Sequence, residues 1–353
     1  MSLVELARLE IQQLHAYAAA EQVADTIRLN ANESPPLSTG DQYRRPLNRY
    51  PEVRPQRLQA ALARRFGCET TQLLVTRGSS EAIDLLVRSF CRAGQDSVLT
   101  TAPTFSMYRH YAAIQGADVI EVPTSASQDF ALDVEALIAA CQPDTRLIFV
   151  CSPNNPTGTM LAAEQLERLL EARSKLSAVV VDEAYIEFAD APSSIDLLDR
   201  YPNLIVLRTL SKALALAGAR CGAAIGQQPV IEMLSAVQAP YAMATPVVEC
   251  VEDALQDERL TLAESAVAGI VEERGRLITA ISDYSFVDRV WPSSGNFFLA
   301  RVEDPQRLMR HCASRGILLR YFGGELQDFV RISVGGPADN DQLLHALDAL
   351  EKS

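Results

Sequence analysis

Three short runs of aliphatic residues place the strongest limit on how this chain can fold. The runs are Leu147–Cys151, Ala178–Val181 and Leu204–Leu207. Runs that are apolar at every position are typical of parallel strands covered by helices on both faces of the sheet. Residues 161–175, between the first two runs, carry leucines near helical spacing and complete a β-α-β unit. The pattern therefore predicts an α/β fold.

The pattern changes on both sides of this α/β region. Residues 1–44 show no sustained periodicity and are typical of an extended arm. Beyond about residue 245, a helical stretch (247–282) precedes two strand-like runs, Phe297–Val302 and Phe329–Val334, with a helix between them. A chain of 353 residues is long enough for a large and a smaller domain. We expect an N-terminal arm (1–44) packed on the small domain, a large domain (45–245) and a small α+β domain (246–353).

Charge and the placement of reactive side chains exclude several classes of function. The formal net charge is −13 and no Lys/Arg-rich run interrupts it, which argues against a nucleic-acid partner. Seven scattered cysteines without a C-x-x-C pair, and four histidines without ligand spacing, predict neither a disulfide framework nor a metal site. The first 14 residues have no apolar signal core, and no stretch is long enough to cross a bilayer. We expect a cytoplasmic protein without a membrane partner.

Two acidic residues, Asp182 and Glu183, directly follow the apolar run that ends at Val181. The carboxyl edge of a parallel sheet is where open α/β sheets bind ligands. Such a carboxylate can hold Mg²⁺ in a nucleotide site or lie beneath the ring nitrogen of a cofactor. The nucleotide reading requires a G-x-x-x-x-G-K-[ST] loop, which this chain lacks. Taken alone, an Asp-Glu pair at a strand end is also an ordinary structural feature.

A lysine, Lys212, follows the next apolar run, with Ser211 before it and Arg220 eight residues later. A partly desolvated ammonium has a lowered pKa and can form a Schiff base. The glycines that flank Arg220 permit close backbone approach, and its guanidinium can bind a phosphate with two nitrogens. A lone lysine at a strand end is more often a solvated cap, so the signal lies in the combination.

Two further segments supply groups of the same kind. Ser79 and Ser80 precede a helical pattern, where either is a natural N-cap and the free N–H groups of the first turn can hold an anion. Most serine-capped helices, however, bind nothing. Asn155 lies in a Pro/Gly-rich turn after the run that ends at Cys151, and its amide can point over the sheet edge.

Together these groups match the needs of pyridoxal phosphate. That cofactor requires an amine, a carboxylate at its pyridine nitrogen, donors at its phenolic oxygen and an anion cup for its phosphate. It also gains from an aromatic ring stacked on its face. Lys212 can supply the amine and Asp182 the carboxylate, while Asn155 and Tyr185 can donate to the phenolic oxygen. The anion cup can be formed by Ser79, Ser80, Ser211 and Arg220. Tyr108 can provide the stacked ring.

The order of the motifs resembles the fold-type I, class II aminotransferases that use pyridoxal phosphate. The motifs are Gly-Ser-Ser-Glu (78–81), Pro-Thr-Phe-Ser-Met-Tyr (103–108), Ser-Pro-Asn-Asn-Pro-Thr-Gly (152–158), Val-Asp-Glu-Ala-Tyr (181–185) and the segment 209–222 around Lys212. Within that family the chain looks most like the histidinol-phosphate aminotransferases. That narrower likeness depends on Leu-Asn-Ala-Asn-Glu (29–33), Asn-Arg-Tyr-Pro-Glu (48–52), residues 182–188 and Arg-Ile-Ser-Val-Gly (331–335).

The resemblance implies a large domain with a mixed, mostly parallel sheet and a smaller α+β domain. It assigns catalysis to Lys212, Asp182 and Tyr185, with the phosphate held by the serines and Arg220 named above. It further implies a homodimer in which Tyr50 reaches the phosphate of the partner subunit. Arg320, Arg331, Asn155 and Tyr17 would contact the substrates, L-histidinol phosphate and glutamate or 2-oxoglutarate. The loop 321–324 departs from the family pattern.

Three alternatives share the same motifs. Two are enzymes of the same fold, a broad-specificity or aromatic aminotransferase and a threonine-phosphate decarboxylase. The third is a non-catalytic module that senses pyridoxal phosphate, which the intact Lys212 and its neighbours disfavour.

Overall fold

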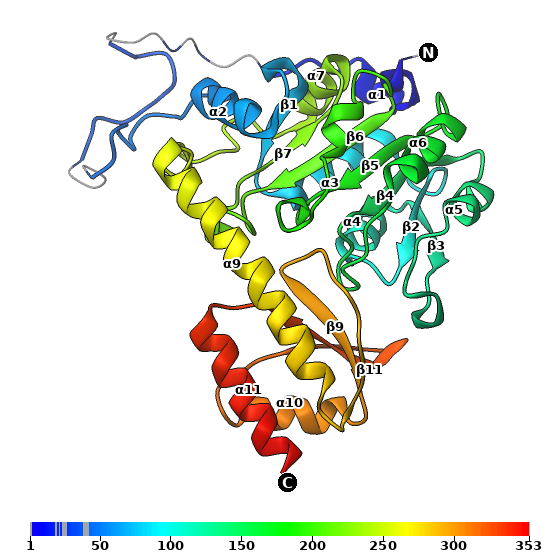
Figure 1. Ribbon diagram of the computed structural model, residues 1–353. Coiled ribbons are helices and arrows are strands. Elements are labelled where there is room, and N and C mark those ends of the chain that lie inside the picture. Colours follow the sequence, from blue (N-terminus) through cyan, green and yellow to red (C-terminus); the bar gives the residue numbers. More distant parts are fainter. Residues whose placement is uncertain (1, 18–19, 21, 23–26, 38–41, 353) are drawn as a thin grey trace.

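The computed structural model describes residues 2–17, 20, 22, 27–37 and 42–352, and it shows a large and a small domain (Figure 1). The large domain contains a seven-stranded sheet in the order β1-β7-β6-β5-β4-β2-β3. Its strands are β1 (Leu73–Thr76), β2 (Ser97–Ala102), β3 (Asp118–Pro123), β4 (Thr145–Cys151), β5 (Ala178–Asp182), β6 (Leu204–Thr209) and β7 (Gly222–Ile225). Strands β2 to β6 are parallel, and β7 runs antiparallel to both of its neighbours. The predicted α/β fold and the three predicted strands are confirmed.

Helices cover both faces of this sheet, which explains why its central strands are apolar at every position. The helices are α1 (Leu9–Gln12), α2 (Gln56–Phe66), α3 (Ser79–Phe90), α4 (Met107–Gln115), α5 (Val134–Ala140), α6 (Ala163–Ala172), α7 (Gln228–Val237) and α8 (Thr245–Ala254). One face packs on α2, α5, α6 and α8, and the other packs on α3, α4 and α7. Successive residues of each strand enter opposite cores: in β5, Val179 joins the first and Val180 the second.

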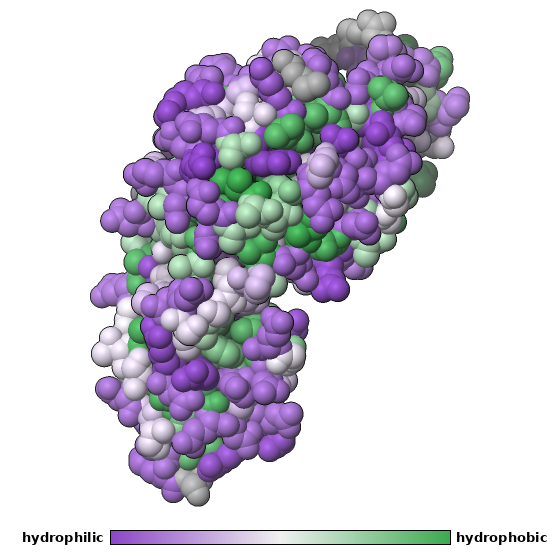
Figure 2. Space-filling view, turned by 90° about the vertical axis from the view of Figure 1, so that its right-hand side faces the viewer, coloured by the Kyte–Doolittle hydropathy of each residue, from purple (hydrophilic) through white to green (hydrophobic). Residues whose placement is uncertain are grey.

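The small domain is a four-stranded antiparallel sheet, ordered β10-β11-β9-β8, backed by helices. Its elements are α9 (Asp257–Ser282), β8 (Val287–Val290), β9 (Phe297–Val302), α10 (Pro305–Ala313), β10 (Arg320–Gly323), β11 (Leu326–Ser333) and α11 (Pro337–Glu351). Alternate residues of β9 and β11, such as Phe298 and Ile332, pack against the helices. The long helix α9 links the two domains, and the molecule narrows where they meet (Figures 1 and 2).

The structure corrects two expectations about domain organisation. First, the described start of the chain packs on the large domain and not on the small one. Leu3 and Ala7 join the core beneath α3 and α7, and the backbone N–H of Arg8 donates to the Ser89 carbonyl at 3.0 Å. The apolar side chains of this segment therefore find their cover on the sheet's helical layer.

Second, the large domain extends beyond residue 245. The predicted helical stretch 247–282 is two helices, and the first of them, α8, belongs to the large-domain core through Val248, Val251 and Leu255. The two domains therefore separate along α9. No helix among the described residues is long and apolar enough to cross a membrane.

Candidate active site

The central residues of the site lie at or just after the carboxyl ends of three adjacent parallel strands. Asp182 is the last residue of β5, Asn155 follows β4, and Lys212 follows β6. Because β4, β5 and β6 are neighbours in the sheet, these side chains meet at one edge, where open parallel sheets bind ligands. The sequence-predicted set is thus brought together.

Asp182 is fully buried at this edge. Its carboxylate accepts hydrogen bonds from the Tyr108 hydroxyl at 2.9 Å and from the Ala184 backbone N–H at 3.2 Å. Burial raises the pKa of the Asp182 carboxyl to about 6, although these two hydrogen bonds and the charge of Lys212 act in the opposite direction. A carboxylate so poorly solvated gains strongly from a cationic or N–H partner, which a protonated pyridine nitrogen provides.

Tyr108 does not fit the stacking role expected from the sequence. Its ring is completely buried, lies parallel to Phe149 with centroids 4.8 Å apart, and directs its hydroxyl at Asp182. No face of this ring remains open to a cofactor. Phe105, in the same motif, is half-buried and contacts Tyr108 edge-on at 5.7 Å. The motif offered two aromatic residues, and the local pattern alone did not distinguish them.

Lys212 has the partly desolvated environment predicted for it. Burial is the main cause that lowers the pKa of its ammonium, and the charges of Arg331 and Arg220 lower it further, against the opposing effect of Asp182. Its Nζ lies 5.4 Å from the centroid of the Tyr185 ring. A lowered pKa makes the neutral amine, which is the nucleophilic form, more available at neutral pH.

Asn155 connects the two domains. Its Nδ2 donates to the Tyr185 hydroxyl at 3.2 Å, and its Oδ1 accepts from Nη1 of Arg331 on β11 of the small domain. Burial raises the pKa of the Tyr185 phenol well above its usual value, so the phenol keeps its proton as a donor. The expected pair Asn155 and Tyr185 is therefore in contact, with a small-domain arginine added to it.

An anion cup lies beside Lys212, at the start of α3. Arg220 donates to the Ser211 hydroxyl at 3.3 Å, and a Cβ placed on Gly78 would lie 2.8 Å from its Nη2. The N-cap of α3 is Gly78, which has a φ of +77°. Neither serine is the N-cap, because Ser79 and Ser80 are the first two residues of the helix. Among the described residues no carboxylate pairs with Arg220. The guanidinium, the hydroxyl and the helix N-terminus suit a phosphate group.

The two arginines expected to contact the substrates lie together on the small domain, where their positive charges suit an anion. Arg320 and Arg331 are direct partners across β10 and β11. Phe322 lies beneath both guanidinium groups, at 5.3 Å from Arg320 and 5.6 Å from Arg331, and Phe297 lies 5.3 Å from Arg331. Neither arginine has a carboxylate partner within the described part of the chain. The two aromatic neighbours were not expected from the sequence.

Tyr17 and Tyr50 form a separate aromatic group on the surface. Tyr50 stacks on Tyr241 with centroids 4.7 Å apart, and Tyr17 meets the same ring edge-on at 6.2 Å. Glu33 accepts from the Tyr50 backbone N–H at 2.8 Å and from Arg49 at 2.6 Å, which fixes the position of Tyr50. Both tyrosines are about half exposed, so their rings face outward from this chain.

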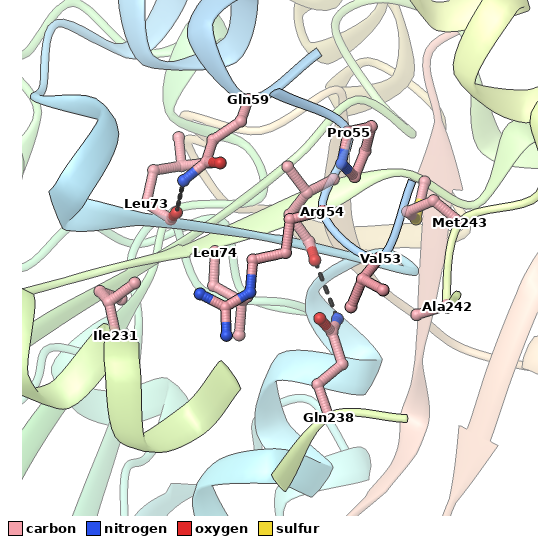
Figure 3. Close-up of a pocket in the computed structure, with 11 residues that line it drawn as sticks. Val53, Arg54, Pro55, Gln59, Leu73, Leu74, Ile231, Gln238, Ala242 and Met243 are labelled. Atoms are coloured by element: carbon pink, nitrogen blue, oxygen red, sulfur yellow. Dashed lines mark hydrogen bonds between the residues drawn. The ribbon is translucent and has the colours of Figure 1, made fainter. Parts of the chain in front are cut away.

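A small cavity elsewhere in the large domain is unrelated to the site. It lies between α2, β1 and α7 and is lined mainly by apolar side chains, including Leu73, Leu74 and Ile231 (Figure 3). Its two amides are already engaged: Gln59 donates to the Leu73 carbonyl and Gln238 to the Val75 carbonyl, both at 2.9 Å. None of the residues predicted for the site lines it.

The site therefore has the donors and charges that define a fold-type I pyridoxal-phosphate enzyme: an amine, a buried carboxylate, a phenol and an anion cup. Comparison with known proteins supports the same class of enzyme. The family model of aminotransferase class I and II matches residues 17–350. The chain belongs to this family, and its cofactor is pyridoxal phosphate.

Individual relatives and solved structures narrow the likeness. The chain is 42% identical over 352 residues to the histidinol-phosphate aminotransferase of Xylella fastidiosa. The matched region covers 98% of this chain and 96% of that protein. It is similar to the crystal structure of the histidinol-phosphate aminotransferase from Clostridium acetobutylicum, with 25% identity, a TM-score of 0.78 and coverage of 87% and 91%. The Sinorhizobium meliloti enzyme in complex with pyridoxal-5'-phosphate gives a TM-score of 0.78, 27% identity and coverage of 87% and 83%.

Proposed function

We propose that this chain is a histidinol-phosphate aminotransferase, which moves an amino group between L-histidinol phosphate and 2-oxoglutarate in histidine biosynthesis, in the cytoplasm. The observation that carries this proposal is the arginine pair Arg320 and Arg331. Like charges directly opposite on neighbouring strands are destabilising, and an anionic ligand offsets that repulsion. The names of the relatives at about 42% identity point to the same substrate.

The arginine pair suits both half-reactions. Histidinol phosphate carries a phosphate and no carboxylate, whereas glutamate carries two carboxylates. The planar fork of a guanidinium binds phosphate and carboxylate oxygens with similar geometry. Since Arg331 also donates to Asn155, an anion held by Arg331 lies beside the cofactor-binding edge of the sheet.

Bound pyridoxal phosphate supplies an electron sink for the reaction, and the residues of the chain hold it and move protons. Asp182 would accept a hydrogen bond from the ring nitrogen, Asn155 and Tyr185 would donate to the phenolic oxygen, and Phe105 would cover the ring. Lys212, whose pKa is lowered by burial, would act as the general base and acid, taking up a proton at its Nζ and returning it.

Ser79, Ser80, Ser211 and Arg220 would hold the phosphate group of the cofactor, and Tyr50 would reach it from the partner subunit of a homodimer. The outward-facing position of Tyr50, fixed by Glu33, supports this assignment. Tyr17 adds a substrate contact at the same interface. Exposed apolar residues of the same N-terminal segment, Leu29 and Leu37, would be covered in such a dimer.

The test is a substrate panel with the purified holoenzyme. L-histidinol phosphate should convert the bound cofactor to its pyridoxamine form, followed by the change in its absorbance, far faster than L-phenylalanine at equal concentration. Threonine phosphate should release no carbon dioxide. Turnover of glutamate without any reaction of histidinol phosphate, or of imidazole-acetol phosphate in the reverse direction, would overturn the substrate assignment. Faster reaction of phenylalanine would identify a broad-specificity enzyme.

A further inference from the structure

A short turn of the large domain inserts one aromatic side chain into the small domain. Phe130 follows β3 and is 4% exposed. Its ring lies 5.6 Å from the Trp291 ring and 5.8 Å from the Phe329 ring, which are 5.4 Å from one another. Leu299 and Leu326 complete this group, called here the interdomain aromatic cluster. Phe130 is its large-domain member.

The backbone of this turn adopts an unfavourable conformation to place Phe130. Asp129 and Phe130 have φ values of +55° and +53°, a region that is uncommon for residues with a Cβ and most unfavourable for bulky ones. The conformation is retained by contacts on both sides. The Phe130 N–H donates to the Ser125 carbonyl at 2.8 Å, and Asp129 forms an ion pair with Arg289, whose guanidinium lies 4.7 Å from the Trp291 ring.

The cluster shares one face of the small-domain sheet with the substrate arginines. Arg331 lies two residues after Phe329 on β11, and its direct partner on β9 is Leu299. Residues two apart on a strand lie on the same face, so Phe329, Leu299 and Arg331 point together. The alternate residues, including Val330 and Ile332, pack on the helices behind. A side chain that packs against Phe329 therefore helps to fix the position of the part of β11 that carries Arg331.

Other contacts between the two domains lie close to this cluster. Arg331 donates to Asn155, and the Ser294 N–H donates to the Gly158 carbonyl at 2.9 Å. A Cβ on Gly158 would overlap the Ser293 side chain, so the backbones approach closely there. Two aromatic side chains supply buried apolar contacts here: Phe130, and Phe297, whose ring centroid lies 5.0 Å from that of Tyr185 in the large domain.

We propose that Phe130 is a positioning residue for substrate binding, because its insertion beside Trp291 and Phe329 sets the distance between Arg331 on the small domain and Lys212 on the large domain. The inference deepens the proposed function and rests on the role of Arg331 in holding a substrate anion. It predicts that loss of the Phe130 ring weakens substrate binding and leaves the cofactor, which large-domain residues hold, bound as before.

The test compares holoenzyme carrying Phe130→Ala with the wild type in two measurements. The chain has one tryptophan, Trp291, so its fluorescence reports on the cluster directly, in the apoenzyme as well. Phe130→Ala should shift the Trp291 emission to the red and increase its quenching by acrylamide. The KM for L-glutamate and for L-histidinol phosphate should rise on the order of 10- to 100-fold, the loss of affinity expected when a hydrogen bond to a charged group is weakened. The kcat and the Kd for pyridoxal phosphate should change little, because only uniform substrate binding is lost.

Two further variants separate positioning from general destabilisation. Phe130→Leu, which keeps an apolar side chain in the cluster, should give a much smaller rise in KM and also serves if the alanine variant does not fold. Phe286→Ala is the control, because Phe286 stacks on Tyr284 at 5.3 Å, with both residues in the small domain, and packs, partly buried, against the core behind the sheet. It should lower stability without raising KM.

Three results would overturn the proposal: a red-shifted Trp291 emission with an unchanged KM, an equal rise in KM for Phe286→Ala, or a parallel loss of cofactor affinity. The substrate pair also keeps this inference apart from the proposed function. If the wild type does not react with histidinol phosphate but Phe130→Ala raises the KM for glutamate, the substrate assignment is wrong and the positioning role of Phe130 is retained.

Discussion

The hydrogen bond that Tyr108 donates to Asp182 should control the charge of the Asp182 carboxylate. Replacement by Phe removes a single hydroxyl, 2.9 Å from Oδ2 of a fully buried carboxylate. A hydrogen bond to a charged group contributes roughly 1.5–3 kcal/mol, and one pKa unit corresponds to about 1.4 kcal/mol. The pKa of Asp182 in the apoenzyme, about 6 in the wild type, should therefore rise by about one to two units in Tyr108→Phe.

The raised pKa of Asp182 determines how the stability of the apoenzyme changes with pH. The pKa of Asp182 is raised on folding, from 3.8 to about 6, so the folded apoenzyme is favoured when the carboxyl is protonated. The free energy of unfolding should fall by about 3 kcal/mol as the pH rises from below 4 to above 6. In Tyr108→Phe the decline should continue to about pH 7–8, since the carboxyl of the variant keeps its proton to higher pH.

The assay is urea unfolding of apoenzyme at a series of pH values. Because other groups titrate in the same range, the informative quantity is the difference between the wild type and Tyr108→Phe, repeated in an Asp182→Asn background. The difference should grow between about pH 6 and pH 8 and should be independent of pH once Asp182 is replaced. Identical pH profiles for the wild type and Tyr108→Phe, or a pH-dependent difference that survives in Asp182→Asn, would refute the reasoning.

Three other substitutions probe the site. Lys212→Ala should abolish the near-visible absorbance of the bound cofactor and the exchange activity while circular dichroism stays native; persistence of the colour would mean that another amine binds the cofactor. Gly78→Ala should weaken the binding of pyridoxal phosphate at least tenfold, because its Cβ would lie 2.8 Å from Nη2 of Arg220 and its φ is +77°; an unchanged Kd by equilibrium titration would exclude the anion cup. Arg331→Lys should raise the KM for glutamate more than it lowers kcat, since an ammonium cannot offer a planar fork; equal kinetic constants would remove Arg331 from the substrate site.

Much of the site was predictable because its residues are adjacent to strand ends. Asp182, Lys212 and Asn155 each follow an apolar run, and parallel strands bring their carboxyl ends to one edge whatever the details of packing. The lowered pKa of Lys212 followed from its position at the end of a buried strand, and the structure has it in that state.

The errors came from contacts between segments far apart in the chain. Whether Tyr108 or Phe105 keeps an open ring face depends on Phe149 and Asp182, which are distant in the sequence from the motif that contains both aromatics. The start of the chain packs on the large domain because α3 and α7 cover its apolar side chains, and no local periodicity indicates which surface accepts them.

The sequence by itself determined the α/β fold and the cofactor, and it predicted Lys212 as the lysine that binds the cofactor. Those features follow from the order of apolar runs and from residues that lie next to them in the chain. Only the tertiary structure decided which ring supports Asp182, which aromatic side chains surround Arg331 and how Phe130 joins the two domains. The physical reason is that these relations arise from packing between distant segments, where the shape of a neighbour, and not the local sequence, selects the side chain that fits.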